Sequence, residues 1–199
     1  MLYDEPVFRP PSEASSLILQ VTIGCSHNAC TFCDMYKGKH FRIKEWEAIQ
    51  KDIEEASQYA IHTKRIFLAD GNALSMPTEI IFHLLNLLYT TFPQLQRVTA
   101  YAGPKDILNK NFDELKQLRK AGLTILYMGI ESGHDPILQS VHKGVSSQEM
   151  QEAGQKALET GFALSVTIIN GLGGKEKSQE HAVDTAKLLS ACLLYTSFA

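Results

Sequence analysis

The sequence lacks an excess of basic charge, because 19 lysines and arginines stand against 22 aspartates and glutamates, for a net charge of -3. A general binder of polyanions carries a basic excess, so a small molecule is favoured over nucleic acid as a partner. The longest apolar stretch, residues 80–92, is interrupted by His83 and Asn86 and is shorter than the ~20 residues that a bilayer requires. The first residues show neither the basic nor the apolar segment of a secretory signal. We therefore expect a cytoplasmic protein without a membrane span.

Cysteine is also scarce, with 4 residues among 199. A chain of this length buries roughly 70% of its unfolded surface and needs no disulfide to fold. Three of the four cysteines lie within residues 25–33, and this crowding favours a metal site over a disulfide framework. The sequence contains no second group of cysteines that would signal an auxiliary cluster, and we assign no role to Cys192.

Length and composition predict one globular domain with short flanks. The chain is 44% hydrophobic and 21% charged, which is typical of a single globular unit of this length. Residues 1–15 carry three prolines, so we expect an extended N-terminal lead-in there. Residues 16–192 form the predicted core domain. We interpret residues 193–199 as an uncertain tail and a truncation artefact, because a sixth strand would begin there with no helix to cover it.

Apolar and β-branched runs alternate with helical patterns along the whole chain. Strands are expected at 17–23, 65–69, 97–102, 124–130 and 162–169. Helices are expected at 44–59, 78–91, 112–121, 146–160 and from 178 onward. The spacing of Ser146 and Glu149 predicts a capping box, and Gly122 and Gly161 are typical helix stops.

Five strand–helix units in succession predict an α/β fold with a parallel sheet and right-handed crossovers. A closed barrel of eight such units takes about 250 residues, which exceeds the length of this chain. Two architectures remain open at this point, a partial (β/α) barrel of parallel strands and an open doubly wound sheet. Both place ligands at the carboxyl ends of the strands, and every unusual loop in the sequence follows a strand.

The most unusual loop follows the first expected strand and spans residues 24–43. It contains Cys25, Cys30 and Cys33 with the spacing C-x4-C-x2-C. Thiolates are the ligands of iron–sulfur clusters, and zinc accepts them as well. A structural zinc site normally has four protein ligands, so His27 or His40 would have to supply the fourth. The spacing alone leaves two alternatives, a cluster with one open iron and a zinc site.

With Phe32 directly before the third cysteine, this loop resembles the cluster loop of the radical S-adenosylmethionine (radical SAM) superfamily. The resemblance implies that the three cysteines hold a [4Fe-4S] cluster whose open iron binds the amino and carboxylate groups of SAM. It also implies a partial barrel, of which residues 16–190 would supply five of the usual six strand–helix units. The usual spacing of the family is C-x3-C-x2-C, so this chain has an extra residue in the first gap.

A segment after the second strand extends the resemblance. Asp70-Gly71-Asn72 occupies the place of the family's Gly-Gly-Glu motif, and only Gly71 matches it well. The resemblance implies that the backbone at Gly71 and Asn72 receives the amino group of SAM. A plain turn between strand and helix is the alternative interpretation.

After the fourth strand, Gly129-Ile130-Glu131-Ser132-Gly133 is similar to the Gly-x-Glu-Ser-Gly segment of one branch of the superfamily. That branch contains methylthiotransferases and oxygen-independent coproporphyrinogen oxidases. The resemblance assigns Glu131 to the ribose hydroxyls of SAM, and a carboxylate is chemically suited to accept both hydrogen bonds. It also places Ser132 among the residues that bind SAM. The alternative for Glu131 is a helix-capping or salt-bridged carboxylate. Lys143 is either a solvated surface lysine or a site residue.

After the fifth strand, the segment from Ile169 to Gly174 resembles the part of the family fold that packs against adenine. The resemblance assigns Ile169, Gly171 and also Phe32 to the adenosine of SAM. The alternative for the segment is an ordinary glycine-rich turn.

The resemblance implies an enzyme in which a reduced cluster passes one electron to SAM. Methionine and a 5′-deoxyadenosyl radical result, and the radical abstracts hydrogen from a substrate that the sequence does not identify. A flavodoxin- or ferredoxin-like protein is implied as the electron donor. Two other functions fit the cysteines, a zinc-stabilised α/β binding module and a non-catalytic iron–sulfur protein that transfers electrons.

Overall fold

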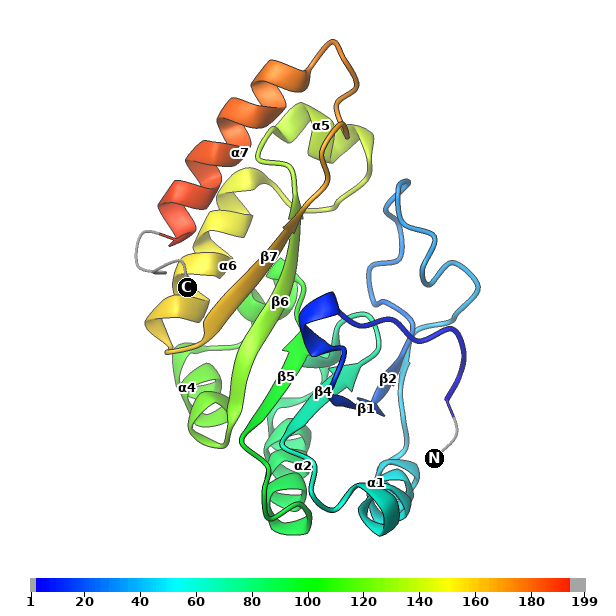
Figure 1. Cartoon of the computed structure of the whole chain (residues 1–199). Helices are drawn as coiled ribbons and strands as arrows, with labels where there is room; N and C mark the ends of the chain where they lie inside the picture. The colour runs from blue at the N-terminus through cyan, green and yellow to red at the C-terminus, as the bar shows by residue number, and fades with distance from the viewer. Residues whose placement is uncertain (1–2, 194–199) are drawn as a thin grey trace.

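The computed structural model describes residues 3–193, and its main feature is a five-stranded sheet with the order β1-β4-β5-β6-β7. Every neighbouring pair of strands is parallel. The carboxyl ends of the strands therefore lie along one edge of the sheet (Figure 1). The strands are β1 (Leu17–Gln20), β4 (Arg65–Ala69), β5 (Arg97–Tyr101), β6 (Leu123–Glu131) and β7 (Ala163–Ile168).

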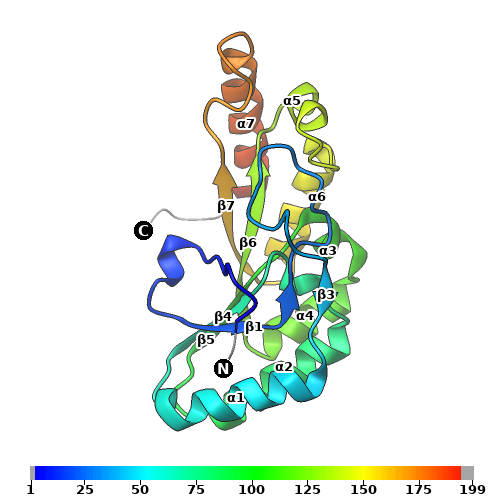
Figure 2. The ribbon, with the colours of Figure 1, turned by 90° about the vertical axis from the view of Figure 1, so that its right-hand side faces the viewer.

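The long helices cover one face of this sheet, and the N-terminal lead-in lies against the other face (Figure 1, Figure 2). This arrangement is the expected partial (β/α) barrel, because an open doubly wound sheet would carry helices on both faces. The long helices are α1 (Trp46–Ala60), α2 (Thr78–Thr91), α4 (Phe112–Lys120), α6 (Ser147–Glu159) and α7 (Ser178–Leu193).

Strand residues alternate between the two faces, and the two faces differ in character. Ile66 and Leu68 on β4 point toward the helices and belong to the main aliphatic core. Phe67, between them, points to the inner face and contacts Tyr101 and Tyr127 edge to face, with ring centroids 5.0 and 6.0 Å away. Such edge-to-face pairs stabilise a cluster beyond the area that they bury.

The prolines predicted an extended lead-in. The structure differs from this prediction at one place, because Pro11–Glu13 form a 3₁₀ turn, η1. Glu13 is completely buried on the inner face of the sheet. Its carboxylate accepts hydrogen bonds from Tyr127 at 2.6 Å and Arg97 at 3.1 Å, and a third from Ser16. A buried carboxylate is tolerated only with such partners, so these contacts anchor the lead-in to the sheet.

The expected first strand is interrupted after Gln20. Residues Thr22–Ile23 form β2, which pairs antiparallel with β3 (Arg42–Ile43), so this short ladder joins the two ends of the cysteine loop. The short helices α3 (Pro104–Asn109) and α5 (Asp135–Ser140) were not expected. Each has six residues, which is less than two helical turns, so its sequence is too short to show the helical spacing of apolar residues.

Within residues 3–193, no helix combines the length and the apolar character that a membrane span needs. Helix α7 ends at Leu193, and the rest of the predicted tail, 194–199, lies outside the described residues. Cys192 is buried in the main core and packs against Gly154.

Candidate functional site

Three thiols lie on the loop between β2 and β3, at the carboxyl edge of the sheet. Cys25, Cys30 and Cys33 are half-buried and form no disulfide. Burial raises the pKa of Cys30, the charge of Lys143 opposes this increase, and the thiols of Cys25 and Cys33 add to it. Within residues 3–193, no three or more His, Cys, Asp or Glu side chains are grouped closely enough to hold a single metal ion.

The cysteine loop packs beside α5 and the end of β6 (Figure 2). The N–H of Thr31 donates a hydrogen bond to the carbonyl of Val141 at 3.0 Å. Nε2 of His27 lies 2.8 Å from the carbonyl of His142. These two contacts hold the loop against the turn after α5, so His27 braces the loop in this structure.

The segment after β4 lies directly against the start of the cysteine loop. A methyl group on Gly71 would lie 2.8 Å from the carbonyl oxygen of Gly24 and 2.9 Å from Cβ of Cys25, so only glycine fits there. The buried side chain of Asn72 accepts a hydrogen bond from the N–H of Ser26 at 3.0 Å. Because this side chain is used within the protein, any ligand contact of Asn72 would come from its backbone.

Glu131 ends β6 in a left-handed conformation, with φ of 65°, which few residues other than glycine adopt. Its Oε1 accepts a hydrogen bond from Nζ of Lys143 at 3.2 Å, so the salt bridge considered as an alternative is present. Its Oε2 is buried and has no hydrogen-bond partner within residues 3–193. An unpaired buried oxygen costs roughly 1–3 kcal/mol, and a ligand hydroxyl would remove that cost.

Lys143 connects Glu131 with the cysteine loop. Its side chain is only 12% exposed, so it is not a solvated surface lysine. Its ammonium lies 6.0 Å from the centroid of the Phe32 ring, which is within the range of a cation–π contact. The structure therefore brings Phe32, Lys143 and Glu131 together beside Cys30.

The remaining predicted residues differ in their surroundings. The N–H of Ile169 donates to the backbone carbonyl of Glu131 at 3.2 Å, so the two residues are adjacent through their backbones. Ser132 is fully buried, and its hydroxyl lies 2.8 Å from Nδ1 of His181 on α7, so it is engaged within the protein. Gly171 is exposed with φ of 83°, and a side chain there would meet nothing within 4 Å. The structure does not pack Gly171 against the other site residues.

Two residues beside the cysteine loop were not assigned to the site by the sequence analysis. Asp70 is completely buried, and its Oδ2 lies 3.0 Å from Nζ of Lys39 on the cysteine loop. The two residues lie 31 positions apart, so no local spacing signals their contact. The only signal available in the sequence is the acidic residue in a motif where the family has glycine.

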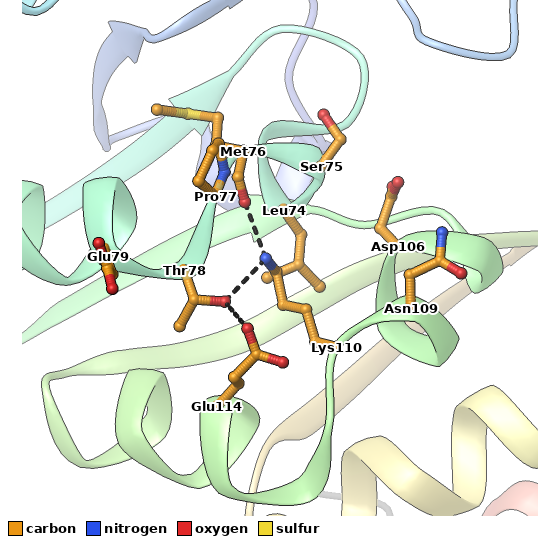
Figure 3. A pocket seen from close by; sticks show the side chains of 10 residues that line it. All are labelled: Leu74, Ser75, Met76, Pro77, Thr78, Glu79, Asp106, Asn109, Lys110 and Glu114. Atoms are coloured by element: carbon orange, nitrogen blue, oxygen red, sulfur yellow. Dashed lines mark hydrogen bonds between the residues drawn. The ribbon is translucent and has the colours of Figure 1, made fainter.

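A cavity of about 390 Å³ lies behind the segment after β4, between η2 (Ala73–Ser75), α2, α3 and α4 (Figure 3). Nζ of Lys110 points to the carbonyl of Met76 at 2.8 Å and the hydroxyl of Thr78 at 3.1 Å. The hydroxyl of Thr78 donates to Glu114 at 2.6 Å. These polar groups bind one another, and no lining residue belongs to the cysteine loop, so this cavity lies apart from the thiols.

Comparison with known proteins identifies related sequences and a related fold. A sequence profile of the radical SAM superfamily matches residues 19–189. The heme chaperone HemW of Bacillus subtilis (strain 168) is 25% identical over 181 residues, which are 84% of this chain and 46% of that protein. The tRNA-2-methylthio-N(6)-dimethylallyladenosine synthase of Dehalococcoides mccartyi (strain CBDB1) is 26% identical over 178 residues, 86% of this chain and 41% of that protein. The chain therefore spans less than half of the length of these relatives.

Among solved structures, the coproporphyrinogen III oxidase HemN from Escherichia coli, described as a radical SAM enzyme, aligns with a TM-score of 0.62. The alignment covers 88% of this chain and 41% of that chain, at 19% sequence identity. At this identity the likeness shows a shared fold.

Proposed function

The chain belongs to the radical SAM superfamily, and on that basis we propose that Cys25, Cys30 and Cys33 hold a [4Fe-4S] cluster beside bound SAM. The observation that carries the proposal is the buried, unpaired Oε2 of Glu131, at the same carboxyl edge of the sheet as three thiols that form no disulfide. When bound, the two cofactors supply one-electron cleavage of SAM to methionine and a 5′-deoxyadenosyl radical, which takes hydrogen from a substrate. The side chains present suit both cofactors. Thiolates are ligands of iron in clusters, and the carboxylate of Glu131 can accept hydrogen bonds from the ribose hydroxyls of SAM.

The residues around the thiols have distinct proposed roles. Glu131 accepts the ribose hydroxyls through Oε2, while Lys143 neutralises Glu131 and offers its ammonium to the carboxylate of SAM. The backbone carbonyls at Gly71 and Asn72 accept hydrogen bonds from the amino group. The absence of a side chain on Gly71 permits this close approach to the loop.

Four further residues support the nucleoside. Phe32 and Ile169 pack against adenine, because both lie close to the Lys143–Glu131 pair and offer apolar surface. Ser132 contributes through its contact with His181, which fixes the turn directly after Glu131. Gly171 contributes backbone beside the base, at a position with room for a ligand.

Electrons must come from another protein. We propose a flavodoxin- or ferredoxin-like donor that approaches the cysteine loop. The substrate is unassigned, and the net charge of -3 favours a small molecule over nucleic acid. Because the chain spans less than half of its curated relatives, the reaction of the whole protein belongs to this proposal as well.

Anaerobic reconstitution with iron and sulfide tests the proposal. We expect about four iron and four sulfide per chain. A Cys30→Ala variant should lose both, and a Cys192→Ala variant, which removes a thiol outside the loop, should keep both. With dithionite and SAM, the reconstituted chain should form 5′-deoxyadenosine.

The other outcomes identify the alternative functions. One zinc and no iron per chain would support the zinc-stabilised binding module. A cluster that forms no 5′-deoxyadenosine and does not respond to SAM would support the electron-transfer protein.

A further inference from the structure

The carboxylate of Asp70 is completely buried at the carboxyl end of β4. Its Oδ2 accepts hydrogen bonds from the N–H of Gly24 at 3.1 Å and from Nζ of Lys39 at 3.0 Å. Nε2 of Gln20 donates to the same oxygen at 3.2 Å. A charged side chain thus occupies the first position of a segment whose family counterpart begins with glycine.

The partners of Asp70 stand at the two ends of the cysteine loop. Gly24 directly precedes Cys25, and Lys39 lies beyond Cys33. The side chain of Lys39 is only 6% exposed, and its ammonium also donates to two backbone carbonyls of the lead-in. One buried ion pair therefore joins the sheet, both ends of the loop and the lead-in.

Asn72 makes a second connection to the same loop. Its Oδ1 accepts from the N–H of Ser26, and its Nδ2 donates to the hydroxyl of Ser26 at 2.5 Å. Nδ2 also donates to the carboxylate of Asp106 on α3 at 2.9 Å, which fixes the amide from behind. Asp70 and Asn72 thus bind the residues on either side of Cys25.

Tyr36 extends this arrangement. It lies on the loop after Cys33 and is buried. Burial and the neighbouring Asp70 carboxylate raise the pKa of Tyr36 far above its ordinary value, so the phenol stays protonated. Oη of Tyr36 and Oδ1 of Asp70 are both buried and have no hydrogen-bond partner within residues 3–193.

We propose that Asp70 and Lys39 are positioning residues that hold both ends of the cysteine loop, so that its three thiolates can share one cluster. This inference rests on the proposed function and deepens it. Neither residue needs to touch the cluster or SAM. Each acts through Gly24 or through the loop backbone.

Hydrogen exchange on the metal-free chain tests the inference without any cofactor. Lys39→Met removes the cation and keeps most of the side-chain volume, and it leaves the Asp70 carboxylate buried without its counter-ion. We expect amide exchange in residues 24–41 to accelerate by about tenfold or more, with β5 to β7 unchanged. Lys187→Met, the same substitution in an exposed ion pair on α7, is the matched control and should leave the loop unchanged. Exchange in residues 24–41 at the wild-type rate would overturn the inference.

A conservative variant and a second site complete the test. Lys39→Arg keeps the charge and should restore slow exchange. Asp70→Asn should accelerate exchange in the same residues. If Asp70→Asn does not fold, as judged by circular dichroism, the two Lys39 variants still decide the question.

The loaded protein gives an independent readout. In Lys39→Met we expect the electron paramagnetic resonance spectrum of the reduced cluster to differ from that of the wild type. In the formation of 5′-deoxyadenosine from SAM, we expect the KM for SAM to rise by a larger factor than kcat falls. Lys187→Met should match the wild type in both. A wild-type chain that takes up no cluster would refute the proposed function, while hydrogen exchange would still decide the positioning role. If the wild-type chain takes up the cluster normally, and Lys39→Met has the same spectrum and the same kinetic constants as the wild type, the positioning role alone is refuted.

Discussion

At the scale of single residues, Glu131 combines two environments in one carboxylate. One oxygen is paired with Lys143, and the other is buried without a partner within residues 3–193. Its left-handed backbone keeps the side chain at the end of β6 instead of letting the strand continue. Strain and an unsatisfied oxygen at the same residue are typical of a site that gains its last partner from a ligand.

Glu131→Gln tests this interpretation. The variant keeps the shape but lacks the charge that strengthens hydrogen bonds to hydroxyls. We expect the affinity of the reconstituted chain for SAM to fall by about tenfold or more, since a hydrogen bond to a charged group contributes roughly 1.5–3 kcal/mol. Equilibrium dialysis with labelled SAM measures the change, and Glu180→Gln, at an exposed position of α7, is the control. Equal affinity in Glu131→Gln and wild type would contradict the role of Glu131.

Residues whose chemistry is visible in short spacings were predictable from the sequence. The cysteines, Phe32 and Glu131 belong to this class, and the structure places both Phe32 and Glu131 beside Lys143. Asp70 and Lys39 do not, because their contact depends on how β4 lies beside the loop. The commitment of the Ser132 hydroxyl to His181 was also invisible, since it depends on where α7 packs.

At the scale of elements, helices with well-formed start signals were predicted closely. Ser146 caps α6, and the expected capping box is present, with the Ser146 hydroxyl accepting from the N–H of Glu149 at 3.2 Å. The hydrogen bonds from Ser146 lower the pKa of Glu149. Elements that depend on neighbours were missed, including α3, α5 and the break between β1 and β2. Their sequences are too short for a period to emerge, so tertiary contacts decide their conformation.

The capping box predicts a pH dependence of stability. Because the folded pKa of Glu149 lies below the ordinary value of 4.5, its contribution is present above that pH and is lost as the pH falls through the lowered value. Glu149→Gln should therefore reduce the free energy of unfolding more at pH 7 than at pH 3. Chemical denaturation at both pH values measures the difference.

Ser146→Ala supplies the companion measurement for the same helix start. Removing the cap should cost about 1 kcal/mol at neutral pH. In a Ser146→Ala background, the pH dependence of Glu149→Gln should shrink only in part, because the carboxylate loses the Ser146 hydroxyl and keeps the Ser146 backbone N–H, which is the larger cause of its lowered pKa. A cost of Glu149→Gln that is the same at pH 7 and pH 3 in the wild-type background would contradict the capping account.

At the scale of the whole molecule, the sheet has helices on one face and the lead-in on the other (Figure 1). The alternation of strands and helices predicted the α/β class and left the partial barrel as one of two architectures. It did not predict which face the lead-in would occupy. That placement depends on the burial of Glu13 against Tyr127 and Arg97, and it also brings the lead-in carbonyls to Lys39.

Glu13→Ala tests how strongly the lead-in is anchored. Arg97 and Tyr127 would lose their shared acceptor, so we expect the free energy of unfolding to fall by about 3 kcal/mol. Tyr127→Phe removes the contacts of this hydroxyl with Glu13 and Ser12 but keeps the Glu13–Arg97 pair, so it should cost less, about 1–2 kcal/mol. Urea denaturation followed by circular dichroism measures both. If Glu13→Ala costs no more than Tyr127→Phe, the buried carboxylate does not anchor the lead-in.

The central claim is that the thiols at the carboxyl edge bind a cluster with an iron open to SAM. Electron paramagnetic resonance of the anaerobically reconstituted, dithionite-reduced chain, recorded with and without SAM, tests it most directly. The account predicts the signal of a reduced [4Fe-4S] cluster whose spectrum changes when SAM is added. A chain that shows no cluster signal, or a signal that SAM leaves unchanged, would contradict it.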